Sequence, residues 1–233
     1  LTVQAQVRCA IHSDPDVLAE AIRRFDTSVR LSDSLDFEVE ERIQWDFEGA
    51  HKHGILRRIP VRYARPYLPD YRIHVDVRSV TDENGSPYPW KARASGDSVE
   101  MRIGDPDVTV TGVREYVIRY RVARGLLYFQ DHDELYWNVN GTWPVATQKT
   151  TATVNLPGDG VQLVACYQGA VGSRETCRAD NTARTANFAS TRTLPEGEQM
   201  TIVVAMNKGL VPNPQPQLEA KPRELPEMFA ATP

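Results

Sequence analysis

The chain has 233 residues, of which 41% are hydrophobic, 25% are charged and 8% are aromatic, and its mean hydropathy is −0.45. These values are typical of a folded, water-soluble domain and argue against a disordered or coiled-coil chain. The 27 basic and 31 acidic side chains leave a net charge of −4, which argues against a uniformly basic surface for nucleic acid or anionic lipid. No apolar run approaches the roughly 18 residues that a membrane-spanning helix needs.

The first 20 residues permit two interpretations. Ser13 and Asp16 have the spacing of a helix-capping pair, and the apolar residues that follow recur at helical spacing, so one interpretation is a helix over residues 13–24. The other is an opening strand over residues 22–31, and the pattern does not decide between them. We therefore expect a short N-terminal segment, residues 1–20, that is helical or irregular.

The central part of the chain alternates between apolar and polar residues. Residues 36–48 show this best, because Phe37, Val39 and Ile43 share one face with Trp45. The same two-residue period recurs in later segments, at 71–77, 99–103, 116–122, 135–139, 152–156 and 202–206. Polar turns such as Asn84-Gly85 separate the segments. This pattern predicts an all-β domain over residues 21–210, an antiparallel β-sandwich of immunoglobulin-like architecture.

The composition changes at the C-terminal end. In residues 211–233 proline recurs every few positions and the apolar residues follow no period. Proline-rich chain is stiff and extended and does not bury a core. We expect this segment to be a tail or tether.

The three cysteines give information about the cellular compartment. Cys166 and Cys177 enclose a short polar loop that can turn back to the Cα separation of a disulfide, while Cys9 has no evident partner. The alternative is a pair of unconnected thiols in a cytosolic protein, since the number of cysteines is odd. The spacing favours the disulfide and with it an oxidising compartment.

One carboxylate falls on the apolar face of a predicted strand. Glu41 lies in register with Val39 and Ile43, where an unpaired charge would be costly, so we expect it to meet a cation, Arg57 or Arg58, or to be protonated. A structural ion pair is the simpler interpretation. A carboxyl group with a shifted pKa at a functional site is the alternative.

The densest set of chemically reactive side chains is Asp131, His132, Asp133 and Glu134. These residues could supply a general acid and base, or they could join Asp105 and Asp107 in a metal site. A calcium loop needs further oxygen ligands at defined spacing, and no such pattern follows, so a solvated acidic turn is the simpler interpretation. We expect no cofactor, because the sequence has no phosphate-binding or dinucleotide-binding motif.

Candidate binding residues come from the aromatic and arginine side chains. Tyr136 and Trp143 could stack on a sugar or a partner protein, and Arg57 and Arg102 could join Glu134 in a pocket. The alternative places the neighbouring Trp137 in the core and leaves Tyr136 on the opposite, polar face of its strand.

Several segments, taken in order, resemble one protein family. They are FEVEERIQWDFEG (37–49), HGILRRIPV (53–61), VRSVTDENGSPY (77–88), MRIGDPDVTVTG (101–112), YVIRYRV (116–122), FQDHDELYWNVNGTW (129–143), the Cys166/Cys177 loop and FASTRTLPEGEQMTIVVAMNKG (188–209). Over roughly residues 21–209 the chain is similar to the extracytoplasmic N-terminal domain of the YciQ-like predicted membrane proteins. The chain departs from the family pattern at Asp33-Ser34 and Met206-Asn207, which affects turns and packing.

The resemblance implies a β-sandwich outside the cytosol, with a signal sequence expected before it and a transmembrane helix beyond the proline-rich tail. It supplies no established activity. Together with the lack of a coherent catalytic motif, this favours a non-enzymatic, membrane-anchored domain on the extracytoplasmic side that binds a protein or glycan of the cell envelope. The alternative is a carboxylate- or metal-dependent hydrolase that uses Asp131 to Glu134.

Overall fold

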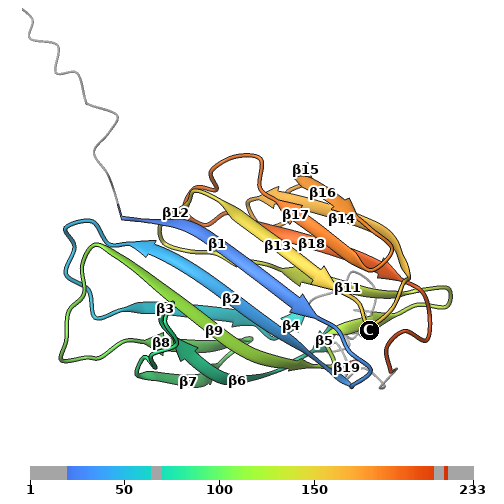
Figure 1. The fold of residues 1–233 in the computed structure, drawn as a ribbon, viewed down its shortest axis with the longest axis horizontal. Coiled ribbons are helices and arrows are strands. Elements are labelled where there is room, and N and C mark those ends of the chain that lie inside the picture. The colour runs from blue at the N-terminus through green and yellow to red at the C-terminus, as the bar shows by residue number, and fades with distance from the viewer. Residues whose placement is uncertain (1–19, 64–69, 213–217, 220–233) are drawn as a thin grey trace, which may run out of the picture.

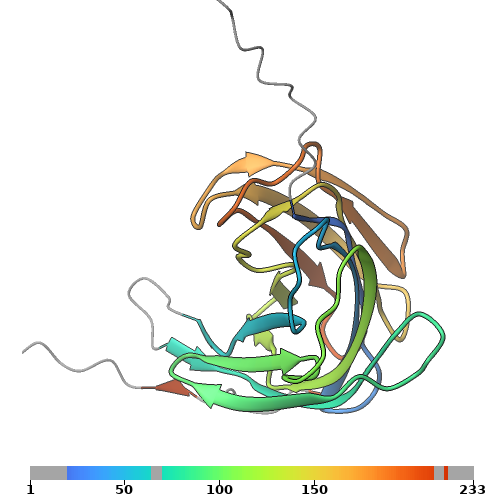
Figure 2. The same ribbon diagram turned by 90° about the vertical axis from the view of Figure 1, so that its left-hand side faces the viewer.

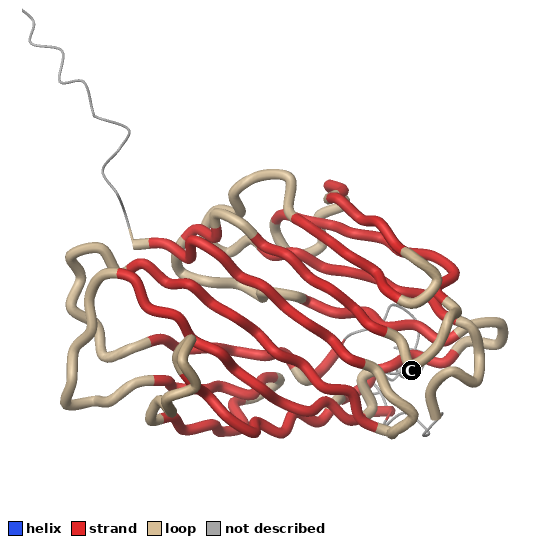
Figure 3. The backbone as a smooth tube through the Cα atoms, in the orientation of Figure 1, coloured by secondary structure: helices blue, strands red, loops and turns tan. Residues whose placement is uncertain are grey.

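The computed structural model describes residues 20–63, 70–212 and 218–219, and all the regular structure in these residues is β-strand. Figure 3 shows strands joined by turns and loops, with no helix among the described residues. The expected all-β class is therefore confirmed. No helix with the length and apolar character needed to cross a membrane occurs in the described part of the chain.

The strands form four sheets. The largest sheet has the order β16 (Arg178–Asn181), β17 (Thr185–Ala189), β13 (Thr150–Asn155), β1 (Ala21–Arg30), β2 (Asp36–Asp46), β9 (Val113–Ala123), β6 (His74–Thr81), with β12 (Ala146–Thr147) also on β1. The second has the order β10 (Leu126–Tyr128), β11 (Asp133–Asn138), β18 (Gln199–Met206), β14 (Val161–Gly169), β15 (Glu175–Thr176).

Two three-stranded sheets complete the fold. One has the order β3 (Ile55–Pro60), β8 (Ser98–Ile103), β7 (Trp90–Ser95), and the other β19 (Leu218–Glu219), β5 (Asp70–Arg72), β4 (Arg62–Tyr63). Seen from the side in Figure 2, the large sheet curves so that the second sheet lies above and the small sheets lie below a shared interior.

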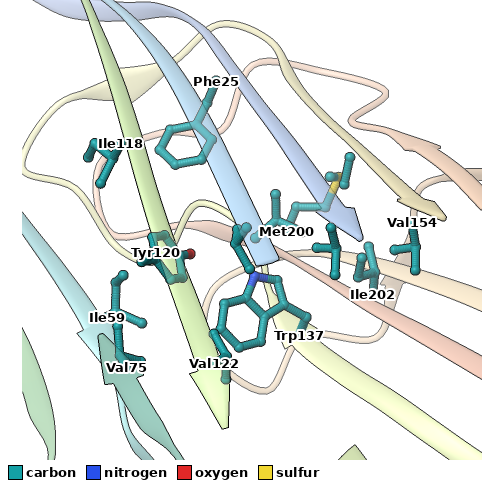
Figure 4. Packing of buried hydrophobic residues seen from close by; sticks show 14 of the residues in the cluster. Phe25, Ile59, Val75, Ile118, Tyr120, Val122, Trp137, Val154, Met200 and Ile202 are labelled. Atoms are coloured by element: carbon teal, nitrogen blue, oxygen red, sulfur yellow. The ribbon is translucent and has the colours of Figure 1, made fainter. Parts of the chain in front are cut away.

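The alternating pattern explains how this interior is filled. In β2 the side chains of Phe37, Val39, Ile43 and Trp45 are buried, as the two-residue period predicts. Their partners across the core come from the second sheet. Figure 4 shows Trp137 of β11 among side chains of β9 and β18. Trp137 is 1% exposed, which confirms its place in the core.

The first strand differs from part of the expectation. Residues 21–24 belong to β1, so the helical interpretation of residues 13–24 is wrong over these positions and the strand interpretation is confirmed. Residues 1–19 of the expected N-terminal segment lie outside the described residues. β1 also pairs in parallel with β12 and β13, while all its other pairing is antiparallel with β2. The large sheet is thus mixed. Residues 31–149 separate β1 from β13 in sequence, yet the two strands lie side by side (Figure 1).

Parts of the expected tail pack against the domain. Val211 is 5% exposed, the Tyr128 hydroxyl donates a hydrogen bond of 3.0 Å to the Pro212 carbonyl, and Leu218 pairs with Tyr71 of β5. Residues 211, 212 and 218–219 are therefore in contact with the domain. The rest of segment 211–233 lies outside the described residues.

Candidate functional site

The acidic cluster is divided between the surface and the core. Asp131 and His132 lie in the turn between β10 and β11, with Asp131 Oδ1 2.8 Å from His132 Nδ1 and with the His132 ring stacked on Phe129. Asp133 is 1% exposed and forms an ion pair of 2.5 Å with Lys208 Nζ. The Lys208 ammonium group also donates to the Phe129 carbonyl, so Asp133 anchors this turn to the end of β18.

The two remaining carboxyl groups lie on either side of His132. Its hydrogen bond lowers the pKa of Asp131, whereas burial raises the pKa of Glu134, whose Oε2 is 3.9 Å from His132 Nε2. Shifts in opposite directions are a property of acid and base pairs. In the described part of the chain, however, no three His, Cys, Asp or Glu side chains are grouped so that they could hold a metal ion. Asp105 and Asp107 therefore do not join Asp131 and Asp133 in such a group.

The inward-facing carboxylate of β2 has a complete set of partners. Both Glu41 oxygens accept hydrogen bonds from Arg57, at 2.8 and 2.7 Å, and Glu41 Oε1 also accepts one of 2.7 Å from the Tyr120 hydroxyl. Arg57 in turn donates to the carbonyls of Val139 and Asn140. Burial alone would lower the pKa of Arg57, but Glu41 outweighs it and raises the pKa, while burial raises that of Tyr120.

This geometry corrects two of the proposed binding residues. Arg57 is 1% exposed and is held by Glu41, and Trp143 is 4% exposed, with its indole nitrogen donating to the Asn140 carbonyl. The Arg57 guanidinium lies 5.6 Å from the Trp143 ring. Both side chains are therefore parts of the interior. Arg102 is on the opposite, outer face of the β3–β8–β7 sheet, so no pocket joins it to Arg57 and Glu134.

Tyr136 leads to a different site. Its side chain lies on the outer face of the β10–β11–β18–β14–β15 sheet, opposite Trp137, and lines a groove of about 320 Å³. We call this feature the tyrosine groove. Its aromatic lining residues are Tyr63, Tyr71, Tyr136 and Tyr167. The volume lies at the lower end of the roughly 300–1,000 Å³ that ligand pockets enclose.

Strand register assembles the floor of the tyrosine groove. Asn138, Thr201 and Tyr167 stand opposite one another on β11, β18 and β14, because Thr201 pairs with both of the others. The Thr201 hydroxyl donates to Asn138 Oδ1 at 2.9 Å. The groove therefore has a row of amide, hydroxyl and phenol groups fixed by three paired strands.

Residues from β4 and β5 form the wall of the groove. The rings of Tyr63 and Tyr71 are stacked with centroids 5.0 Å apart, and Tyr136 meets Tyr63 edge to face at 6.1 Å. Burial raises the pKa of both Tyr63 and Tyr136, so these phenols remain neutral near neutral pH. They can stack and hydrogen-bond, but they are not poised to act as bases.

The loop after β14 closes one end of the groove. Gly169 has a φ of +118°, and a Cβ there would come within 2.7 Å of Ser173 Oγ, so only glycine fits this turn. The expected disulfide is present between Cys166 and Cys177, with a Cα separation of 5.1 Å, and it joins β14 to the chain beyond β15. This cross-link restrains the loop that carries Val171 and Ser173 into the groove.

Sequence reasoning found Tyr136 but missed Tyr63, Tyr71 and Tyr167. Tyr63 comes from a stretch with no clear alternation, and Tyr71 was assigned only to the apolar face of the segment 71–77. Tyr167 stands beside Cys166 in a segment considered only for its disulfide. The recurrence of tyrosine between residues 63 and 71 is the sequence feature that could have indicated an aromatic site there.

Comparison with known proteins gives a fold likeness and a family. No curated protein matches the chain. Leukotriene A4 hydrolase from Saccharomyces cerevisiae is 10% identical with a TM-score of 0.48, over 80% of this chain and 29% of that one. The M1 zinc metallopeptidase from Deinococcus radiodurans is 8% identical with a TM-score of 0.43, over 80% and 42%. This chain thus spans less than half the length of either enzyme, and the likeness is too low to inform function.

The family match covers most of the described residues. The model of the N-terminal domain of a family described as predicted membrane protein (DUF2207) matches residues 21–206, from the start of β1 to the end of β18. That span includes the two larger sheets and all the residues that line the tyrosine groove. The chain therefore belongs to this family of predicted membrane proteins, as its N-terminal domain.

Proposed function

We propose that this chain is a non-enzymatic, extracytoplasmic domain of a membrane-anchored protein and that it binds a neutral glycan of the cell envelope in the tyrosine groove. The observation that carries the proposal is the combination of phenol rings with polar groups that have no other role. Among the described residues, the Tyr167 hydroxyl and the Gln199 side-chain amide have no protein partner.

The chemistry of the lining favours a neutral ligand. The groove has no carboxylate among its lining residues, and its one cation, Arg62, forms ion pairs of 3.1 Å with Asp70 and 3.6 Å with Asp97. Sugar rings present apolar C–H faces to aromatic rings and hydroxyl groups to amides, which matches this set. An extended peptide is the competing ligand, and it would have to pair its backbone along the groove.

The disulfide supports the extracytoplasmic side of the membrane. Disulfides persist in oxidising compartments and are rare in the cytosol. Cys166 and Cys177 should therefore resist alkylation in intact cells until a reductant breaks the disulfide and frees their thiols. Immediate labelling of both cysteines without reductant would contradict this location.

The hydrolase alternative has weaker support. Lys208 already neutralises Asp133, and Asp131, His132 and Glu134 are not among the residues that line the tyrosine groove. A hydrolase would also need a nucleophile or an activated water close to these groups.

The test is a calorimetric titration of the chain with two neutral oligosaccharides, chitotetraose and cellotetraose. We expect at least one to bind, and we expect Tyr136→Ala and Tyr167→Ala to weaken binding by about 1–3 kcal/mol each, as the loss of a stacked ring does elsewhere. Tyr88→Ala is the matched control, because Tyr88 is also half-buried but packs on Tyr116 outside the groove.

Two results would contradict the proposal. One is equal binding by the Tyr136→Ala, Tyr167→Ala and Tyr88→Ala variants, which would remove the groove from the site. The other is binding of an extended proline-rich peptide, but of neither sugar, in the same groove.

A further inference from the structure

The outer face of the β3–β8–β7 sheet is unusually basic for a chain with a net charge of −4. Strand register places Lys91 beside Arg102, and in the next row it places Arg93, Glu100 and Arg58 side by side. Glu100 is the only acidic residue of the three strands. We call the four cations and Glu100 the arginine face, which has an excess of three positive charges.

Glu100 fixes the arginines without covering them. Its side chain is 4% exposed, and it receives Arg93 at 2.8 Å, Arg58 at 3.1 Å and Arg102 at 3.8 Å. Hydrogen bonds from Arg93 and Arg58 lower the pKa of Glu100, so it stays ionised. The three arginine side chains remain 63%, 63% and 73% exposed. Most of each arginine side chain is therefore accessible to a ligand.

Carboxylates outside the three strands leave most of this charge uncompensated. Glu20 and Glu196 line a hollow that reaches only Arg58 of the four cations, and Glu20 also pairs with Lys52. Asp97, in the turn between β7 and β8, forms ion pairs with Arg62 and Arg72. Asp105 and Asp107 belong to the loop after β8, where Asp105 Oδ1 accepts the Asp107 backbone amide. By contrast, acidic and basic residues alternate on the outer face of β2 and β9.

We infer that the arginine face binds the anionic headgroups of the membrane to which the protein belongs. Arginine forks match phosphate oxygens, and clustered cations are attracted to an anionic lipid surface. Two of the cations, Lys91 and Arg93, are on the edge strand β7, of which five of the six residues are exposed. The net charge predicted no uniform basic surface, and this local one arises from strand pairing.

The position of the face agrees with this assignment. In Figures 1 and 2 the β3–β8–β7 sheet and β19, the last described element, lie on the same side of the molecule. The family match makes the chain the N-terminal domain of a membrane protein, so the membrane part follows it in sequence. The arginine face is separate from the tyrosine groove, and no residue belongs to both.

The test is cosedimentation of the 233-residue chain with vesicles of phosphatidylcholine, with and without phosphatidylglycerol. We expect binding only to the vesicles with phosphatidylglycerol and expect it to fall as salt is raised. Each basic residue near an anionic surface is worth about 1 kcal/mol, so Arg93→Gln with Arg102→Gln should weaken binding about 25-fold. The control is Arg119→Gln with Arg121→Gln, which removes the same charge from another exposed face.

A second variant protects the test against misfolding. Lys91→Glu changes the charge of the face without removing a partner of Glu100, and it should weaken vesicle binding about fivefold or more. Equal binding to both vesicle types, or equal loss in the control pair, would overturn the inference. Binding to soluble polyphosphate but not to phosphatidylglycerol vesicles would assign the face to a soluble polyanion instead and would also overturn it.

Discussion

Strand β2 carries acidic side chains on both of its faces, and their surroundings differ between the two faces. Inside, Glu41 is 0% exposed and is bound by Arg57 and Tyr120. Outside, Glu40 meets Arg119 at 2.7 Å, with the two side chains 30% and 45% exposed. The same kind of ion pair, a glutamate with an arginine, therefore occurs once in the protein interior and once at the surface in contact with water.

This comparison teaches that burial, and not distance, decides what an ion pair contributes. Removing one partner of a buried pair leaves an uncompensated charge in a medium of low dielectric constant. An exposed pair is screened by water and salt, and each partner is solvated when the other is lost. The interior pair should hold the fold, whereas the exterior pairs mainly keep the sheet surface soluble.

The largest effect should come from breaking the buried pair. We expect Arg57→Leu to lower the free energy of unfolding by about 3–5 kcal/mol, because Glu41 would remain charged or become protonated inside the core. Urea denaturation measures this change. The double variant Glu41→Gln/Arg57→Leu should recover part of the loss, and no recovery would indicate that packing of Arg57 against Phe25, and not its charge, is what matters.

An intermediate effect should come from an ion pair with one buried partner. Asp133 is 1% exposed, whereas the Lys208 side chain is 38% exposed. Because Lys208 can be solvated when Asp133→Asn removes the charge, we expect the loss of a charged hydrogen bond alone, about 1.5–3 kcal/mol. In thermal unfolding, the loss of stability of this variant should lie between the loss in Arg57→Leu and the loss in Arg119→Gln, a variant of the exposed pair. A loss as large as that of Arg57→Leu would contradict the importance of burial.

The smallest effect should come from the outer face. Arg119→Gln should change stability by about 1 kcal/mol or less, and the difference should shrink further in high salt. Denaturation at two salt concentrations checks both statements. A large, salt-independent loss would show that the outer face contributes to the fold as the interior does.

The sequence was sufficient to predict the elements but not all of their partners. Alternation over residues 36–48 placed Glu41 inside, and the spacing of Cys166 and Cys177 predicted their disulfide. Both depend on local order along the chain. The parallel pairing of β1 with β13 depends on contacts between distant segments, which a two-residue period does not encode.

The candidate site was harder to predict for the same reason. Tyr63, Tyr136 and Tyr167 line one groove because β4 lies beside the β11–β18–β14 face. Trp143 was proposed as an exposed aromatic side chain for binding, yet its indole lies against Trp45 in the core. Local composition identifies a turn but not the depth at which its side chains lie.

The most direct test of ligand binding in the tyrosine groove is an NMR titration of the ¹⁵N-labelled chain with chitotetraose. We predict chemical-shift changes in Asn138, Gln199 and residues 167–173, including the side-chain amide signals of Asn138 and Gln199, and little change in the arginine face or the Asp131 turn. Shifts confined to the Asp131 turn, or no shifts up to millimolar sugar, would contradict the assignment of this groove as a glycan-binding site.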